Sequence, residues 1–265
     1  MPDTVLLEID DSVATMTLNR PDSLNAIDHV LAKDLREAAL EAEMNSQVRC
    51  LVVRGSGPAF MAGGDIKWFG KNLDGNAEEK PIKFEKFINQ VHRIIISIRR
   101  MPKPVVASVR GPAAGFGFSL TMACDLVIAA DNAFFTLAYV NIGASPDGGS
   151  TFALPRILGA KKAAEIAFLG DRINAATAKE MGLVNWVVPE DDLEEETVKV
   201  AKRLANSPTV VLGRTKSLLQ QSLNTTLESQ LQAEATSFAV CASEPDFAEG
   251  IAAFISKRSP EFRGK

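Results

Sequence analysis

One acidic residue, Asp147, lies in the segment Asn141–Thr151, NIGASPDGGST, between a proline and two glycines. No basic residue is near enough in this segment to pair with it. The order Pro-Asp-Gly is typical of a tight turn, in which an aspartate needs no chemical role. A lone carboxylate among apolar groups is also a good proton acceptor, because burial raises its pKa. The segment alone leaves both interpretations open.

Two further loops are rich in glycine, at Pro58–Phe69 (PAFMAGGDIKWF) and at Arg110–Leu120 (RGPAAGFGFSL). Each is predicted to lead from a strand into a helix, whose first-turn N–H groups are free and favour negative charge. Two such loops facing each other would hold one carbonyl oxygen between two N–H groups, which is an oxyanion hole. Ordinary strand-to-helix turns have the same composition, so the loops alone do not decide the chemistry.

Several other chemistries are disfavoured. Neither loop fits G-x-x-x-x-G-K-[ST] or G-x-G-x-x-G, and the chain contains no G-x-S-x-G elbow. His29 and His92 lie in helical patterns without a neighbouring ligand, so we expect no metal site. Large apolar residues on or beside the three loops favour an apolar pocket, with plain core packing as the alternative. They are Phe60, Met61, Trp68, Phe69, Phe116, Phe118 and Tyr139.

The elements that would position these loops alternate between strands and helices. Apolar runs separated by helical periodicity predict an α/β fold with strands covered on both faces. We predict a hairpin around Asp10–Ser12, strands at 49–56, 104–111, 126–131 and 133–139, and helices at 26–44, 83–101 and 115–125.

After about residue 155 the pattern is mainly helical. We predict helices at 160–170, 174–182 and 193–206, one strand at 183–189, and helical segments from Pro208 to the end, with Pro245 in the first turn of the last helix. A helical tail with no core of its own must pack on the body or on another subunit. We therefore predict a core over 1–200 and a helical oligomerisation region over 201–265.

Composition excludes several classes of partner. The 265 residues carry a net charge of −4, so the chain has no overall positive charge to attract nucleic acid or an anionic membrane. No apolar run reaches the roughly 20 residues that a transmembrane helix needs. The N-terminal segment carries acids where a signal peptide would carry bases. Cys50, Cys124 and Cys241 are too far apart for a disulfide framework, so we expect a cytoplasmic protein without nucleic-acid or membrane partners.

Six segments together resemble the crotonase superfamily, also called the enoyl-CoA hydratase/isomerase family. They are LNRPDSLNAI (18–27), AFMAGGDIK (59–67), KPVVASVRGPAAGFGFSLTMACDLVIAA (103–130), NIGASPDGGSTFALPRILG (141–159), AATAKEMGLVNWVV (175–188) and FISKR (254–258). The resemblance covers the chain nearly end to end. It implies a spiral of β-β-α turns with a helical trimerisation tail, and hence a homotrimer or hexamer. It also implies an acyl-CoA thioester substrate. Because coenzyme A is part of that substrate, we expect no separate cofactor.

The resemblance assigns roles by motif position. It implies that the backbone N–H groups of Gly64 and Phe116 hold the thioester oxygen as it becomes an enolate. Residues beside the first loop would contact coenzyme A, namely Leu24, Ala62, Gly63, Asp65, Ile66 and Lys67. Phe254 and Lys257 match C-terminal residues that reach the nucleotide, in many members from a neighbouring subunit.

The sequence departs from the family's hydratases at two positions. Those enzymes use two glutamates to add water, and here Ser119 and Tyr139 stand in their places. Adding water needs one group that takes a proton and one that delivers it, and hydroxyls near their usual pKa values do neither well. A conventional hydratase is therefore disfavoured. We expect Ser119 and Tyr139 to shape the pocket or to offer hydroxyls to the substrate.

Three hypotheses follow. Asp147 resembles the single acid of the family's Δ3,Δ2-enoyl-CoA isomerases and of its ring-isomerising relatives, so the first is an isomerase with Asp147 as proton shuttle. The second is an aryl- or acyl-CoA dehalogenase or hydrolase, with Asp147 as nucleophile and His92 as base. The third is a CoA-ester binding protein without catalysis.

Overall fold

The larger sheet begins with a hairpin. The structure, a computed structural model, describes residues 3–73 and 78–264. Strands β1 (Val5–Asp10) and β2 (Val13–Leu18) pair antiparallel, and Asp11 and Ser12 between them adopt positive φ angles of 45° and 65°. Short polar side chains tolerate this left-handed backbone better than branched ones do. The predicted hairpin is confirmed.

Four parallel strands continue this sheet. They are β3 (Cys50–Gly55), β4 (Val105–Val109), β6 (Leu126–Ala130) and β9 (Trp186–Val188), in the order β1-β2-β3-β4-β6-β9. A smaller sheet contains β5 (Pro112–Ala114), β7 (Phe134–Thr136) and β8 (Ile173–Asn174). The sequence does not predict β5 and β8, because their three and two residues are too few to show an alternating pattern.

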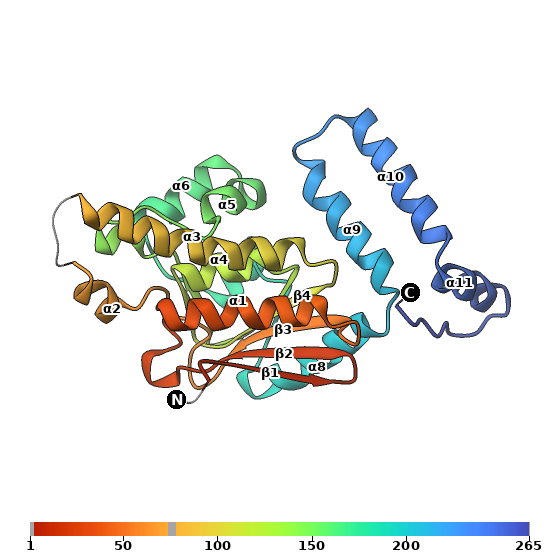
Figure 1. Cartoon of the computed structure of the whole chain (residues 1–265), viewed down its shortest axis with the longest axis horizontal. Helices are drawn as coiled ribbons and strands as arrows, with labels where there is room; N and C mark the ends of the chain where they lie inside the picture. The colour runs from red at the N-terminus through yellow and green to blue at the C-terminus, as the bar shows by residue number, and fades with distance from the viewer. Residues whose placement is uncertain (1–2, 74–77, 265) are drawn as a thin grey trace.

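Helices cover both faces of the larger sheet (Figure 1). Helices α1 (His29–Met44) and α3 (Glu79–Arg100) lie over one face, and α8 (Leu193–Ala205) lies over the other. Strand β4 is buried along its whole length, as the apolar pattern predicts. The edge strand β1 differs, because four of its six residues are exposed.

Shorter helices follow the glycine-containing loops. Helix α2 (Ile66–Lys71) follows the first loop and α4 (Phe116–Ala123) follows the second, as predicted. Helix α5 (Ser150–Leu158) follows the loop that contains Asp147. The sequence does not predict α5, because two glycines precede it and Pro155 lies inside it. Helices α6 (Ala160–Leu169) and α7 (Ala175–Glu180) then lead to β9.

The C-terminal region consists of α9 (Thr209–Ser222), α10 (Leu227–Ala242) and α11 (Pro245–Ile255). Helix α9 is attached to the body by the buried Lys216, whose ammonium lies 2.7 Å from a carboxylate oxygen of Asp125. Helices α10 and α11 extend away from the sheets (Figure 1), and no residue of α10 is buried. The predicted boundary at 200/201 falls inside α8, which continues to Ala205.

The last residues depart from the predicted helical pattern. Residues 256–264 form no helix, and Pro260 interrupts the helical periodicity there. This segment folds back along α11, where the Arg263 and Gly264 N–H groups each donate to the carboxylate of Asp246 at 2.7 Å. Arg49 binds the Phe262 carbonyl at 3.1 Å. Among the helices of the described residues, none combines the length and apolar character that crossing a bilayer requires.

Candidate active site

The N-terminal loop is joined to the first glycine loop by Asn25. This side chain is fully buried, and its NH2 group donates to the carbonyl oxygens of Ser56, Ala59 and Phe60 at 3.0, 2.9 and 3.2 Å. Its carbonyl oxygen accepts the Arg20 N–H at 2.8 Å. A buried amide with every donor used holds two chain segments in one relative position.

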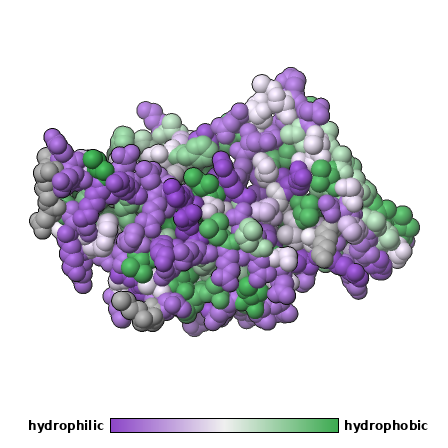
Figure 2. Space-filling model, in the orientation of Figure 1, coloured by the Kyte–Doolittle hydropathy of each residue, from purple (hydrophilic) through white to green (hydrophobic). Residues whose placement is uncertain are grey.

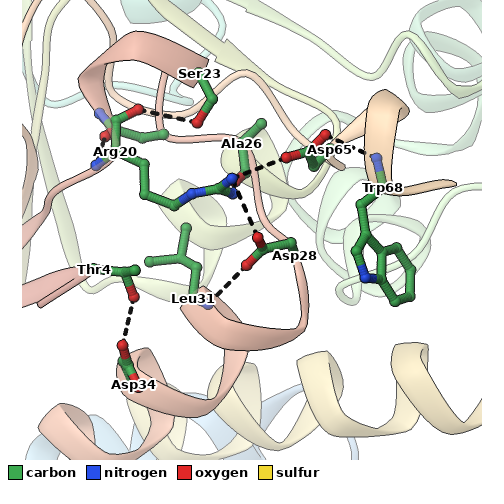
Figure 3. A network of polar contacts seen from close by, with 10 residues as sticks. Thr4, Arg20, Ser23, Ala26, Asp28, Leu31, Asp34, Asp65 and Trp68 are labelled. Atoms are coloured by element: carbon green, nitrogen blue, oxygen red, sulfur yellow. Dashed lines mark hydrogen bonds and ion pairs between the residues drawn. The ribbon is translucent and has the colours of Figure 1, made fainter. Parts of the chain in front are cut away.

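Arg20 links the starts of two helices (Figure 3). Its guanidinium lies 3.0 Å from Asp65 and 3.2 Å from Asp28, and it also donates to the Ala26 carbonyl. Asp65 caps α2 through the Trp68 N–H, and Asp28 caps α1. Burial acts to raise the pKa of Asp65, but the Trp68 N–H and Arg20 stabilise the carboxylate and the net effect is a lowered pKa. Asp65 is therefore held as an anion beside Gly64.

The backbone N–H of Gly64 is aimed by the peptide bond that contains it. The Gly63 carbonyl accepts the Ile27 N–H at 2.7 Å, and the Ile27 carbonyl accepts the Asp65 N–H at 2.9 Å. In a trans peptide the C=O and N–H point in opposite directions, so the Gly64 N–H points away from Ile27. Within residues 3–73 and 78–264 no protein acceptor satisfies this N–H.

The N–H of Phe116 is aimed in the same way. The Gly115 carbonyl accepts the Ser119 N–H at 3.1 Å as the first turn of α4 closes, so the Phe116 N–H points out of the helix start. It also has no acceptor in the described part of the chain.

The two loops that carry these N–H groups are in direct contact. The Met61 N–H donates to Pro112 at 3.0 Å, and the Ala114 N–H donates to Met61 at 2.8 Å. A Cβ atom on Gly117 would lie 2.4 Å from the Met61 carbonyl oxygen, so glycine is required there for the loops to approach this closely. Two free N–H groups on touching loops can hold a carbonyl oxygen as it gains negative charge.

Asp147 is partly buried, and its carboxylate is held by Tyr139. The phenol hydroxyl of Tyr139 donates to Oδ1 of Asp147 at 2.5 Å. Burial raises the pKa of Asp147 above its usual 3.8, although the Tyr139 hydrogen bond acts in the opposite direction. Burial and the adjacent carboxylate also raise the pKa of Tyr139, so the pair consists of a neutral phenol and a basic carboxylate.

The peptide between Asp147 and Gly148 is held from both sides. The Asp147 carbonyl accepts the hydroxyls of Ser119 at 2.9 Å and Ser150 at 3.0 Å. On the opposite side, the Gly148 N–H donates to Nε2 of His92 at 3.2 Å. His92 Nε2 therefore carries no proton in this arrangement. The residues in place of the hydratase glutamates, Ser119 and Tyr139, thus bind the Asp147 backbone and side chain.

Most of the predicted coenzyme A contacts lie together. The Leu24 carbonyl accepts the Ala62 N–H at 2.9 Å, which places Leu24 beside the loop from Ala62 to Asp65. The side chains of Ile66 and Lys67 are exposed at the start of α2. Phe254 is 85% exposed on α11, with Lys257 just beyond. Figure 1 shows α11 and α2 at opposite ends of the molecule, so Phe254 and Lys257 are not brought to this chain's own site.

The structure decides between alternatives that the sequence left open for several individual residues. Phe60, Met61 and Phe118 belong to the fully buried core rather than to a pocket wall. His29 is paired with Gln90 at the surface, through Nδ1 at 3.0 Å. The residue order gives no sign of the roles of Arg20 and Asn25, although they lie in the matching segment at 18–27. A buried asparagine and a paired arginine are recognisable only once their partners, distant in sequence, are known.

Two touching glycine loops and an isolated carboxylate, on a core of β-β-α turns with a helical tail, define the class of protein. The family model for enoyl-CoA hydratase/isomerase matches residues 8–265. The chain therefore belongs to this family, the crotonase superfamily, whose enzymes process acyl-CoA thioesters.

Individual relatives differ in chemistry. The chain is 36% identical over 267 residues to 1,2-epoxyphenylacetyl-CoA isomerase of Escherichia coli (strain K12), with 100% of each chain covered. It is 34% identical to 4-chlorobenzoyl coenzyme A dehalogenase-1 of Arthrobacter sp, covering 96% of this chain and 91% of that one. The crystal structure of an enoyl-CoA hydratase from Polaromonas sp. JS666 matches with a TM-score of 0.92 and 36% identity, covering 98% of this chain and 99% of that one.

Proposed function

We propose that this protein is an isomerase of unsaturated acyl-CoA thioesters, with Asp147 as the group that moves the proton. The observation that carries the proposal is a single partly buried carboxylate of raised pKa, held by a phenol where a hydratase has a glutamate. Asp147 takes a proton from C2 of a 3-enoyl thioester and returns it at C4, while the double bond moves from C3–C4 to C2–C3. No water is consumed, and no cofactor is needed beyond the coenzyme A of the substrate.

The N–H groups of Gly64 and Phe116 supply the second part of the mechanism. Removal of the C2 proton places negative charge on the thioester oxygen, and two free donors on touching loops are suited to hold it. Loss of one such donor typically costs about 3–4 kcal/mol of barrier. Because Asn25 and Arg20 hold the Gly64 loop, they act as positioning residues for this donor.

The coenzyme A moiety would lie along the exposed edge formed by Leu24 and the segment from Ala62 to Lys67. We propose that Phe254 and Lys257 act on the coenzyme A of a neighbouring subunit in a trimer or hexamer, because α11, which carries Phe254, lies at the opposite end of the molecule from α2 (Figure 1). Figure 2 shows hydrophobic residues gathered where α10 and α11 form the end of the molecule, which supports an interface there. Three unpaired thiols support a reducing compartment, and we propose the cytoplasm.

Replacement of the carboxylate tests the central assignment. Asp147→Asn should reduce 3-enoyl-CoA isomerisation by at least about a thousandfold, the upper part of the range for a proton-transfer group. Its affinity for a saturated acyl-CoA should change little. The matched control is Asp191→Asn, at an exposed aspartate, which should retain wild-type activity. Full activity in Asp147→Asn would contradict the proposal. The same assay of the wild type with 1,2-epoxyphenylacetyl-CoA distinguishes a ring-type substrate from a chain-type substrate.

A second candidate is a dehalogenase or hydrolase in which Asp147 attacks the substrate. The favourable observations are the 34% identical dehalogenase and the position of His92 beside the Asp147 loop. The lone pair of His92 Nε2 is already used by the Gly148 N–H, which weakens its suitability as a base for water. Mass measurement of the peptide containing Asp147, after mixing with 4-chlorobenzoyl-CoA, distinguishes the candidates: an adduct supports the nucleophile. Binding without turnover of any ester would instead indicate a non-catalytic protein.

A further inference from the structure

A cavity of about 370 Å³ opens beside the Asp147 loop. The near wall is formed by Ser119, whose hydroxyl donates to the Asp147 carbonyl, and by Gly148, the residue after Asp147. Further along, the walls are mostly apolar and come from three helices, α3, α4 and α5. These residues are Ile95, Ile96, Met122, Ala123, Phe152 and Ala153. The cavity is thus suited to the acyl part of a thioester whose reacting carbons lie at Asp147.

The far end of the cavity is cationic. Arg99 and Arg100 at the end of α3 line it, together with Gln220 of α9. The same three residues border an adjoining hollow of about 490 Å³, to which Arg214 and Lys216 contribute. Neither lining contains an aspartate or glutamate among the described residues. An acyl group that extends from Asp147 into this cavity would meet both apolar side chains and guanidinium groups.

Arg99 is a half-buried cation that lines both hollows. Lys216 is bound to Asp125 at 2.7 Å, but in the described part of the chain no carboxylate lies within ion-pair distance of the half-buried Arg99. The Arg99 guanidinium lies 5.4 Å from the centre of the Phe152 ring, and the cation Arg156 lies 3.6 Å from the same ring. Burial lowers the pKa of Arg99, with Asp125 opposing and Arg156 adding to this effect. An anion bound beside Arg99 would compensate the positive charge of its half-buried guanidinium group.

We propose that the acyl group of the substrate ends in a carboxylate, which Arg99 binds, so that the substrate is the mono-CoA thioester of an unsaturated dicarboxylic acid. This rests on the proposed isomerase function and names its substrate class. Position 99 follows His92, which contacts Gly148, by seven residues on α3. At 1.5 Å per residue this is about 10 Å, a distance that a medium-length chain spans.

The test compares two 3-enoyl-CoA substrates of equal chain length, one ending in a methyl group and one in a carboxylate. Wild-type kcat/KM should favour the carboxylate by about tenfold to a hundredfold, the range for a hydrogen bond between charged groups. Arg99→Met should lose this preference through a higher KM, with activity on the methyl-ended substrate retained. Arg99→Lys should keep part of it. The control is Arg93→Met, an exposed arginine on the same helix, which should keep the full preference.

The possible outcomes separate the inference from the function on which it rests. Turnover of both substrates without a preference, or equal losses on both in Arg99→Met, would overturn the carboxylate subsite and leave the isomerase intact. Turnover of neither substrate would overturn the isomerase. In that case calorimetry with the saturated dicarboxylic and monocarboxylic CoA esters still tests the carboxylate subsite. Arg99→Met must weaken the binding of the dicarboxylic ester and leave the affinity for the monocarboxylic ester unchanged.

Discussion

Asp147 and Tyr139 share one hydrogen bond, and its direction determines what each group can do. The phenol donates and the carboxylate accepts at 2.5 Å, so the carboxylate stays available as a base only while the phenol keeps its proton. Burial favours this distribution, because it raises the pKa of both groups. A glutamate at position 139 would instead repel Asp147, and one at 119 would remove a donor to its backbone.

The pH dependence of activity should report on this bond. Activity needs ionised Asp147, so kcat/KM of the wild type should fall on acidification through a pKa above the usual 3.8. The Tyr139 hydrogen bond lowers the pKa of Asp147, so Tyr139→Phe should move this acidic limb to higher pH. A pH–rate profile measures the shift. Ser119→Ala affects the backbone carbonyl of Asp147 rather than its carboxylate, so it should leave the acidic limb of the profile in place. An unmoved acidic limb in Tyr139→Phe would contradict the assignment of Asp147 as the base.

Stability should depend on pH through the same carboxylate. A raised folded-state pKa means that the favourable contribution of Asp147 is complete below the unfolded pKa near 3.8 and is lost as pH rises through the folded pKa. Asp147→Asn cannot ionise, so its unfolding free energy relative to the wild type should be higher at neutral pH than in acid. Urea unfolding of both proteins at the two pH values measures the difference. A constant difference would mean that the carboxylate is not destabilised by burial.

At the scale of elements, the contact between the two glycine loops limits which residues are allowed. Gly117 lies inside α4 with its α-carbon facing the Met61 carbonyl, where an added methyl would come within 2.4 Å of the oxygen. Gly70 lies inside α2 with no atom within 4 Å of the same added methyl. The same Gly→Ala substitution is therefore expected to lower the free energy of unfolding at position 117 and to raise it at position 70.

Gly117→Ala should destabilise the protein by about 1–3 kcal/mol, as overpacking typically does, and should lower kcat by separating the Gly64 and Phe116 donors. Gly70→Ala should stabilise by about 0.5–1 kcal/mol, since alanine favours the helix. Thermal or urea unfolding together with the isomerase assay tests both. Equal effects at the two positions would show that the loop contact is not restrictive.

At the scale of the whole molecule, the helical tail exposes more apolar surface than a solitary chain normally does. Leu227 and Leu231 on α10 are 68% and 53% exposed, and Phe254 and Ile255 on α11 are 85% and 74% exposed. Helix α10 packs mainly on α9 and α11, and in the described part of the chain none of its residues is buried. Another subunit is the partner that would remove this surface from water.

Sedimentation of the intact chain should show a trimer or hexamer. Leu227→Asp should shift it toward smaller species, because an ionised carboxylate in an apolar interface is costly. Met44→Asp, at a methionine that is 82% exposed on α1, is the matched control and should sediment as the wild type does. A wild-type monomer at micromolar concentration would contradict the oligomer, and with it the placement of Phe254 and Lys257 at a neighbour's site.

Periodicity was enough to predict the hairpin, the buried parallel strands and the long helices, because local patterns of apolar residues decide those elements. The loop motifs were enough to bring Asp147, Gly64 and Phe116 to attention. Short elements escaped prediction for physical reasons. Strands β5 and β8 are too short to show a period, and α5 contains a proline.

Other properties arise only from contacts between residues far apart in the chain. Asn25 bonds to carbonyls more than 30 residues away, and Arg20 joins the caps of two helices. The orientation of the Gly64 N–H depends on a bond from Ile27 to the preceding carbonyl. The basicity of Asp147 depends on burial and on Tyr139. Residue order alone specifies which groups are present, whereas direction, burial and pairing are set by the folded chain, because hydrogen bonds and charges act through space.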